Sequence, residues 1–326
     1  MKIIFIYLIS LPMIIFGDES GGLSFLNIPT SGNSASLGNT ITADLYRPTS
    51  LLQNPANIWQ NSQHTFSISK RSAITQTNYL NGFYGLKIRD LTFCLGVVKY
   101  GVNKIEEYDT EANFLGYFNF QNWAIALGTS KRMSGMLFGI GVSHITQNFT
   151  QISYNKENFL GLDIGVTVMD LLYRNNNVIL TVSYVNKIMF DIPDFQQVNS
   201  ATSNNILGIK TLFRQNSISL SIFSDLLFNA NSKMVNMRAG LQPQINFKNN
   251  VLTNAGINIG LNKLPLYWTD DDIFNDDFIE YSRKLSIGGY LEIMLPVINQ
   301  NMLINYAYEN HKVLPASQYV SIQFSI

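Results

Sequence analysis

The chain has 326 residues, of which 46% are hydrophobic, 12% aromatic and only 13% charged. Its 22 basic and 22 acidic residues give a formal net charge of +0, and this argues against nucleic-acid binding, which requires a basic excess. The single cysteine, Cys94, excludes an intramolecular disulfide.

Residues 1–17 have the pattern of a secretory signal peptide. Lys2 precedes an apolar run from Ile3 to Phe16 that is too short to span a bilayer as a helix, and we expect cleavage after Gly17. No later segment approaches the ~20 consecutive apolar residues of a transmembrane helix. A protein without a helical span can still be an integral membrane protein if it is a closed β-barrel, because closure satisfies every backbone group.

Residues 18–62 are rich in glycine, proline and polar residues and do not show the alternation of a strand. We interpret them as a hatch or plug that folds back into the lumen of the barrel, because a wide barrel encloses more space than its own side chains fill. The alternative is a disordered periplasmic leader.

Residues 63–326 alternate between apolar and polar residues, with period two, in about fourteen segments. Clear examples lie at 93–97, 160–168, 255–261 and 320–326. The pattern predicts an all-β fold: a transmembrane, antiparallel, up-and-down β-barrel of about 14 strands in the bacterial outer membrane, with apolar side chains against lipid and polar ones in the lumen. A secreted soluble β-protein is the alternative.

The connections between the predicted strands alternate in length, which favours the barrel. Short turns such as Arg89-Asp90 fit the periplasmic side, and longer connections at 101–113 and 262–283 fit the external side. A soluble β-sandwich has no reason to sort its loops in this way.

Four charged residues are predicted to face the lumen, because they share the polar side of their strands: Lys87, Asp163, Arg238 and Glu292. A selective ion pore is lined by rings of charges of a single sign. Charges of both signs instead favour internal pairing or anchoring of a polar plug.

The most acidic segment falls in the longest predicted external loop. It interleaves acids with aromatic residues at Trp268, Asp270, Asp271, Asp272, Phe274, Asp276 and Asp277. Acidic oxygens could bind Ca²⁺, but the spacing lacks the EF-hand glycine, and a solvated acidic loop is the simpler interpretation. The exposed aromatic residues make this loop a candidate surface for contact with a protein partner.

The last strand alternates to the final residue and ends with Phe324 and Ile326. We expect these two residues to face lipid and to form the signal that the barrel-assembly machinery recognises.

Three motifs near the N-terminus resemble the PorV/PorQ family of outer-membrane proteins. They are Phe25-Leu26, the small-residue stretch Ala35-Ser36-Leu37-Gly38, and Asn54-Pro55-Ala56. The segment YDTEANFLGYF at 108–118 is similar as well. The resemblance implies a fourteen-stranded barrel with an N-terminal hatch, related to FadL-type fatty-acid transporters, and a role in type IX protein secretion and surface attachment.

The sequence gives little support for catalysis. His64, His144 and His311 lie far apart, and no phosphate-binding loop, zinc motif or serine nucleophile elbow is present. We therefore expect no enzyme activity, no cofactor and no metal site.

Two functions remain open. The first is a partner or shuttle in protein export that contacts secretion-system proteins or secreted cargo. The second is a FadL-like transporter of hydrophobic small molecules. A lateral gap in the barrel wall would favour transport, whereas a closed wall with a shaped external surface would favour export.

Overall fold

The computed structural model describes residues 28–72, 77–149, 156–171, 173–174, 177–192, 201–229, 235–247, 251–266, 284–296, 300–310 and 316–326. The predicted signal peptide and the acidic segment from Trp268 to Asp277 lie outside these residues.

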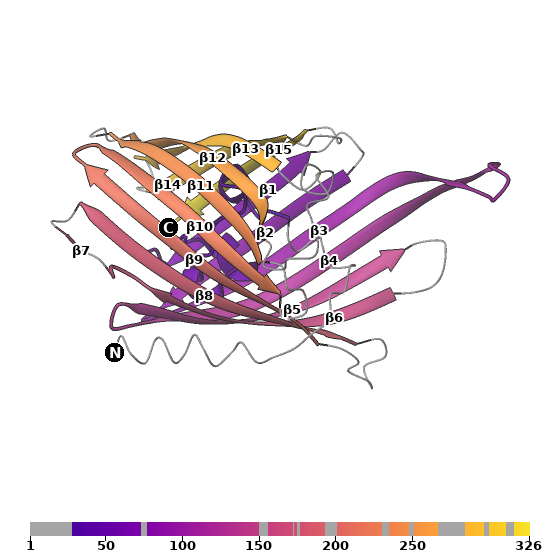
Figure 1. Cartoon of the computed structure of the whole chain (residues 1–326), viewed down its shortest axis with the longest axis horizontal. Coiled ribbons are helices and arrows are strands. Elements are labelled where there is room, and N and C mark those ends of the chain that lie inside the picture. Colours follow the sequence, from indigo (N-terminus) through magenta and orange to yellow (C-terminus); the bar gives the residue numbers. More distant parts are fainter. Residues whose placement is uncertain are drawn as a thin grey trace.

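Strands account for most of the chain (Figure 1). In order they are β1 (His64–Ser72), β2 (Thr77–Ile88), β3 (Leu91–Tyr108), β4 (Phe114–Met133), β5 (Met136–Phe149), β6 (Lys156–Val168), β7 (Tyr173–Arg174), β8 (Val178–Asp191), β9 (Ala201–Gln215), β10 (Ile218–Asn229), β11 (Val235–Asn246), β12 (Leu252–Leu266), β13 (Lys284–Leu295), β14 (Gln300–Asn310) and β15 (Ser317–Ser325).

The strands close into a ring. Each long strand pairs antiparallel with its neighbours, β1 pairs with the last strand β15, and β6 pairs with β8 past the two-residue β7. Fourteen long strands thus form a closed barrel, and the predicted fold class is confirmed. Closure leaves no open sheet edge within the wall, as a membrane-spanning sheet requires.

Burial alternates along the strands with the predicted period of two. In β1, Phe66 and Ile68 are exposed on the outer face, whereas Ser67 and Ser69 are buried on the inner face. An outward apolar band is the surface that faces lipid in an outer-membrane barrel. In the described part of the chain, no helix is long and apolar enough to cross a bilayer.

Several strands are longer than the sequence predicts. Residues 101–108 were expected in an external loop, but they continue β3, and β4 begins at Phe114. The prediction was wrong because apolar alternation marks only the part of a strand that faces lipid. The backbone ladder of a hairpin can continue beyond the membrane without that alternation.

Residues 28–60, which we call the inner segment, lie within the ring of strands (Figure 1). Nearly all of these residues are buried. Three short helices belong to the segment: α2 (Gly32–Ser36), η3 (Pro48–Leu52) and η4 (Pro55–Ile58). Helix α2 contacts β12 to β15, and the other two contact strands from β1 to β6, so the segment reaches both sides of the barrel.

Local sequence explains where these helices begin. Ser31 caps α2, because its side chain accepts from the Ser34 backbone N–H while the Ser34 hydroxyl accepts from the Ser31 N–H. Asn54 caps η4 in the same manner by accepting from the Ala56 N–H at 3.1 Å. Pro48 and Pro55 stand at first helical positions, where a missing N–H is harmless.

The alternation predicted a polar interior, but part of the interior is apolar. Leu51, Leu52 and Ile58 of the inner segment pack against apolar side chains that point inward from β2 to β6. Phe83 and Val98 are two of these side chains. The prediction of a polar lumen was wrong here because the inner segment supplies apolar partners that an empty lumen would lack.

Candidate functional site

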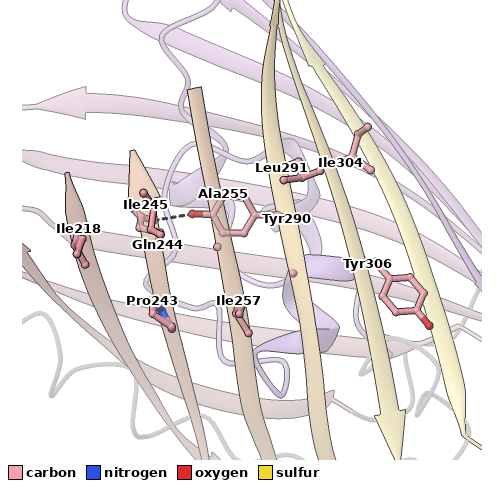
Figure 2. A pocket seen from close by; sticks show the side chains of 12 residues that line it. Ile218, Pro243, Gln244, Ile245, Ala255, Ile257, Tyr290, Leu291, Ile304 and Tyr306 are labelled. Atoms are coloured by element: carbon pink, nitrogen blue, oxygen red, sulfur yellow. Dashed lines mark hydrogen bonds between the residues drawn. The ribbon is translucent and has the colours of Figure 1, made fainter. Parts of the chain in front are cut away.

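The outer face of the barrel carries an apolar groove of about 710 Å³ over β10 to β14 (Figure 2). It is lined by Ile218, Pro243, Gln244, Ile245, Ala255, Gly256, Ile257, Gly289, Tyr290, Leu291, Ile304 and Tyr306. These residues lie near the strand ends that join through the short turns, which places the groove in the periplasmic half of the wall.

A proline in the strand interior explains why the wall is hollowed here. The pairing between β11 and β12 passes from Leu241 with Ile259 to Gln244 with Gly256, and it leaves out Gln242 and Pro243. Proline has no backbone N–H, so it cannot donate to the ladder and is rare in a central strand. The two strands are therefore joined less completely at this height of the wall.

Small residues deepen the groove. Ala255 and Gly289 face outward between the larger Ile257 and Leu291, and they leave space where a lipid-facing strand usually carries a bulky side chain. Ligand pockets of ~300–1,000 Å³ with apolar linings suit small organic molecules. The groove matches that description in both size and lining.

The floor of the groove is formed by residues that face the interior. Tyr290 is only 7% exposed, and its ring covers Gly256, where a Cβ atom would collide with it. The Tyr290 hydroxyl donates to Gln244 Oε1 at 2.7 Å and also approaches Asn254 Oδ1 at 3.5 Å. The Tyr290 ring, held by these hydrogen bonds, therefore covers the inner side of the wall at Gly256.

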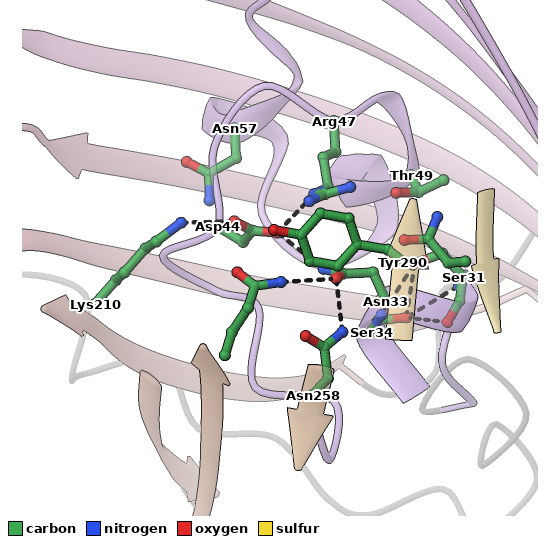
Figure 3. A network of polar contacts seen from close by, with 12 residues as sticks. Ser31, Asn33, Ser34, Asp44, Arg47, Thr49, Asn57, Lys210, Asn258 and Tyr290 are labelled. Atoms are coloured by element: carbon green, nitrogen blue, oxygen red, sulfur yellow. Dashed lines mark hydrogen bonds and ion pairs between the residues drawn. The ribbon is translucent and has the colours of Figure 1, made fainter. Parts of the chain in front are cut away.

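Inside the wall, a polar network fixes the inner segment (Figure 3). Asn33 Oδ1 accepts hydrogen bonds from Gln242 Nε2 at 3.2 Å and from Asn258 Nδ2 at 3.1 Å. Farther along the segment, the backbone N–H and hydroxyl of Thr42 donate to Asp225 at 3.2 and 2.7 Å. These contacts tie buried polar groups of the segment to β10, β11 and β12, as burial of polar groups requires.

Asp44 is the centre of charge in this network. Its carboxylate lies 2.7 Å from Arg47 Nε and 3.0 Å from Lys210 Nζ, and it accepts from Asn33 Nδ2 at 3.2 Å. Burial alone would raise the pKa of Asp44, but the two cations outweigh it and lower the pKa from 3.8 to about 2. The carboxylate therefore stays ionised and holds the segment to β9 through Lys210.

Eight inward glycines let the inner segment approach the wall closely. They are Gly85, Gly128, Gly139, Gly165, Gly208, Gly240, Gly260 and Gly288, and a Cβ atom on each would lie within 3.0 Å of an inner-segment atom. The Asn54-Pro55-Ala56 motif shows the effect, since a Cβ on Gly139 would collide with Pro55 and Ala56, and one on Gly165 with Asn54. Asn54 Nδ2 also donates to Thr167 Oγ1 at 3.3 Å.

Two of the four charged residues predicted to face the lumen, Lys87 and Arg238, contact the inner segment directly. A third, Asp163, lies opposite a lysine that binds the inner segment. Lys87 Nζ lies 4.5 Å from the centroid of the Trp59 ring. Arg238 donates to Asn39 O at 3.4 Å and to Asn262 Oδ1 at 3.1 Å. Asp163 is buried opposite Lys187.

Lys187 in turn donates to the carbonyl of Leu52. Glu292, the fourth predicted residue, is half-buried, and its backbone carbonyl accepts from Thr253 Oγ1 at 3.0 Å.

At the C-terminus, Phe324 and Ile326 are exposed on the outer face, and Phe324 pairs with Phe66 and Met302. In the described ranges, no group of three or more His, Cys, Asp or Glu side chains could hold a metal ion.

Sequence reasoning missed the groove and most of the network. Pro243 was a usable signal, because a proline inside an alternating segment argues for an interrupted ladder. The recurrence of glycine on the polar side of many strands was another signal. Asp44 and Lys210 lie 166 positions apart in the chain, and no local pattern joins them.

Comparison with solved structures places this architecture among known barrels. The CymD monoaromatic hydrocarbon channel matches with a TM-score of 0.55 and 9% identity over 92% of this chain and 98% of that chain. The TodX deltaS2S3 mutant monoaromatic hydrocarbon channel matches with a TM-score of 0.54 and 11% identity over 90% of this chain and 97% of that chain. The Pseudomonas putida toluene transporter TodX matches with a TM-score of 0.50 and 10% identity over 95% of this chain and 98% of that chain.

The chain shares the closed-barrel fold of these three structures. At these identities the likeness concerns the fold alone, and it supports a position in the bacterial outer membrane. No family model matches the chain, and no curated protein does. The PorV/PorQ resemblance of the N-terminal motifs thus finds no support in these comparisons.

Proposed function

We propose that the protein transports hydrophobic small molecules across the outer membrane, and that they pass through the groove in the barrel wall. The observation that carries the proposal is the apolar groove at the interrupted β11–β12 ladder, floored by Tyr290. A molecule held there contacts the lipid-facing side chains and the inward residues at once.

Pairing runs around the whole ring, so the wall has an interrupted ladder rather than the open lateral gap that would favour transport most. A lateral route is nevertheless favoured by the contents of the barrel. The inner segment is buried and bound to strands on both sides of the ring, so a path along the barrel axis would have to displace it. A path through the wall needs only local rearrangement. Apolar solutes are suited to such a path because they are stable in the lipid that lies beside the groove.

The names of the similar structures support the same solute class. Two are described as monoaromatic hydrocarbon channels and one as a toluene transporter. A small aromatic hydrocarbon would fit a groove of about 710 Å³ lined by aliphatic side chains and two tyrosines. We therefore take toluene as the first probe.

The test is uptake by a bacterial host that lacks its own hydrocarbon channel. Cells that express the full-length barrel should take up labelled toluene faster than cells with the empty vector, while uptake of a labelled sugar stays unchanged. Equal toluene uptake in the two strains would contradict the proposal. Faster uptake of both solutes would indicate an open pore instead.

A role in protein export, implied by the PorV/PorQ resemblance, is the less supported candidate. Co-purification from detergent-solubilised membrane distinguishes the two functions. Export predicts a stoichiometric protein partner, whereas transport predicts a bound apolar molecule that mass spectrometry would detect.

A further inference from the structure

Strands β3 and β4 continue past their neighbours on the external side (Figure 1). β2 pairs with β3 as far as Val102, and β5 pairs with β4 as far as Phe120. Beyond these residues, in the part of the chain that the structure describes, β3 and β4 pair with each other as far as Tyr108 and Phe114. Residues 103–119, which we call the projecting ribbon, reach roughly 20 Å past the wall at ~3.4 Å per residue.

One cluster of aromatic rings stands out on this ribbon. Tyr108, Phe114 and Tyr117 are 54%, 51% and 55% exposed. Their ring centroids lie 5.7 Å apart between Tyr108 and Phe114 and 5.1 Å apart between Phe114 and Tyr117, both in edge-to-face geometry. A contiguous group of exposed aromatic rings is a common mark of an interaction surface.

The turn that carries the cluster is well ordered. The Asp109 carboxylate accepts from the backbone N–H groups of Glu111 and Asn113 at 2.9 and 2.8 Å and from Asn113 Nδ2 at 2.9 Å. The hydrogen bonds from Asn113 lower the pKa of Asp109. These hydrogen bonds fix the backbone of the turn, so binding there loses little further conformational entropy.

The ribbon is acidic around the rings. Between Lys104 and Tyr117 the sequence contains four acidic residues and one basic residue. Glu106 accepts a hydrogen bond from the Tyr108 hydroxyl at 2.7 Å, which places a carboxylate at the edge of the cluster. An anionic lipid surface would repel such a tip, since these surfaces attract basic segments.

We propose that the projecting ribbon docks an arginine-bearing segment of a protein partner. Guanidinium groups stack on the faces of tyrosine and phenylalanine and pair with carboxylates through charge-assisted hydrogen bonds. The cluster and the adjacent acids present both features side by side. This surface lies at the far end of β3 and β4, away from the wall groove, and does not depend on transport.

The experiment uses the full-length barrel in nanodiscs of zwitterionic lipid and a short peptide of alternating arginine and leucine. We expect saturable binding by calorimetry, and no binding of the same peptide with glutamate in place of arginine. Phe114→Leu should weaken binding by about fivefold, because it removes one stacking ring worth ~1 kcal/mol. Glu106→Gln should also weaken binding, more at low salt than at high salt.

Two control variants make the result specific. Phe114→Tyr keeps a ring and should bind as the wild type does, and Leu115→Ser changes an exposed neighbour outside the cluster and should leave affinity unchanged. Absence of peptide binding to the wild type, or equal affinity of wild type and Phe114→Leu, would overturn the proposal. Binding of anionic vesicles through the ribbon, or dimerisation lost in Phe114→Leu, would assign the surface to lipid or to a second copy instead.

Discussion

Tyr290 occupies the position of a barrier between the groove and the interior. Its ring covers Gly256, and its hydroxyl is fixed to Gln244. Ser36 of the inner segment packs close to Gly288, two positions before Tyr290 on the same inward face. Removal of the ring should therefore connect the groove with the interior near Ser36.

We predict that Tyr290→Ala exposes the interior to lipid-soluble reagents. In a Cys94→Ala background with Ser36→Cys as reporter, N-phenylmaleimide should label the Tyr290→Ala barrel several-fold faster than the parent. Tyr306→Ala is the matched control, because Tyr306 lines the same groove from the lipid side. Equal labelling of parent and Tyr290→Ala, in folded barrels, would show that Tyr290 is no barrier.

Asp44 makes the attachment of the inner segment dependent on pH. Arg47 and Lys210 hold its pKa at about 2, below the ordinary 3.8, so the released segment binds a proton more readily than the docked one. The free energy of docking should thus be complete above about pH 4 and fall as the pH drops towards 2.

Pepsin digestion with mass spectrometry measures this loss. Cleavage within residues 28–60 should increase between pH 4 and pH 2 in the wild type, whereas Asp44→Asn should be cleaved readily at both values. Asp109→Asn, in the external turn, is the control and should behave as the wild type in this region. A wild-type segment equally resistant at both values would refute the role of Asp44.

At the scale of elements, the fit between the inner segment and the glycines of the wall decides how firmly the segment is held. Gly165→Val should displace the Asn54-Pro55-Ala56 motif, because its Cβ would collide with the Asn54 side chain. Overpacking of this kind costs about 1–3 kcal/mol. The temperature at which half of the barrel loses its folded mobility on gels should fall accordingly.

Gly82→Val provides the comparison for this variant. A Cβ at Gly82 would meet its nearest atom at 4.0 Å, the carbonyl oxygen of Ser67, so the temperature of this transition should change little. If both variants unfold at the wild-type temperature, close approach at Gly165 does not contribute to stability.

The strands were predictable from the sequence because lipid imposes a strict period of two on residues such as Leu162 and Ile164. Their outer ends were not, since residues 101–108 face water and carry no such period. The inward contacts were only partly predictable from the sequence. Arg238 was assigned to the lumen, but its partner Asn39 lies 199 positions away in the chain. The groove escaped prediction because it arises where Pro243 and Tyr290, on different strands, meet in the closed ring.

At the scale of the whole molecule, a closed wall filled by the inner segment should not conduct ions freely. Deletion of residues 21–50 removes α2 and most of the polar network, so the truncated barrel should show large conductance in planar bilayers, while the full-length protein shows little. Equal, large conductance for both forms would mean that the segment does not block the lumen in the membrane.

The most direct test of passage through the wall groove is toluene uptake after the groove has been filled. Ala255→Trp places a large side chain in the groove from the lipid side, and Ile259→Trp places the same side chain on the outer face of the same strand, outside the groove lining. With equal amounts of folded barrel, we predict that Ala255→Trp abolishes most of the uptake and that Ile259→Trp retains it. Wild-type uptake by Ala255→Trp would contradict passage through the wall groove.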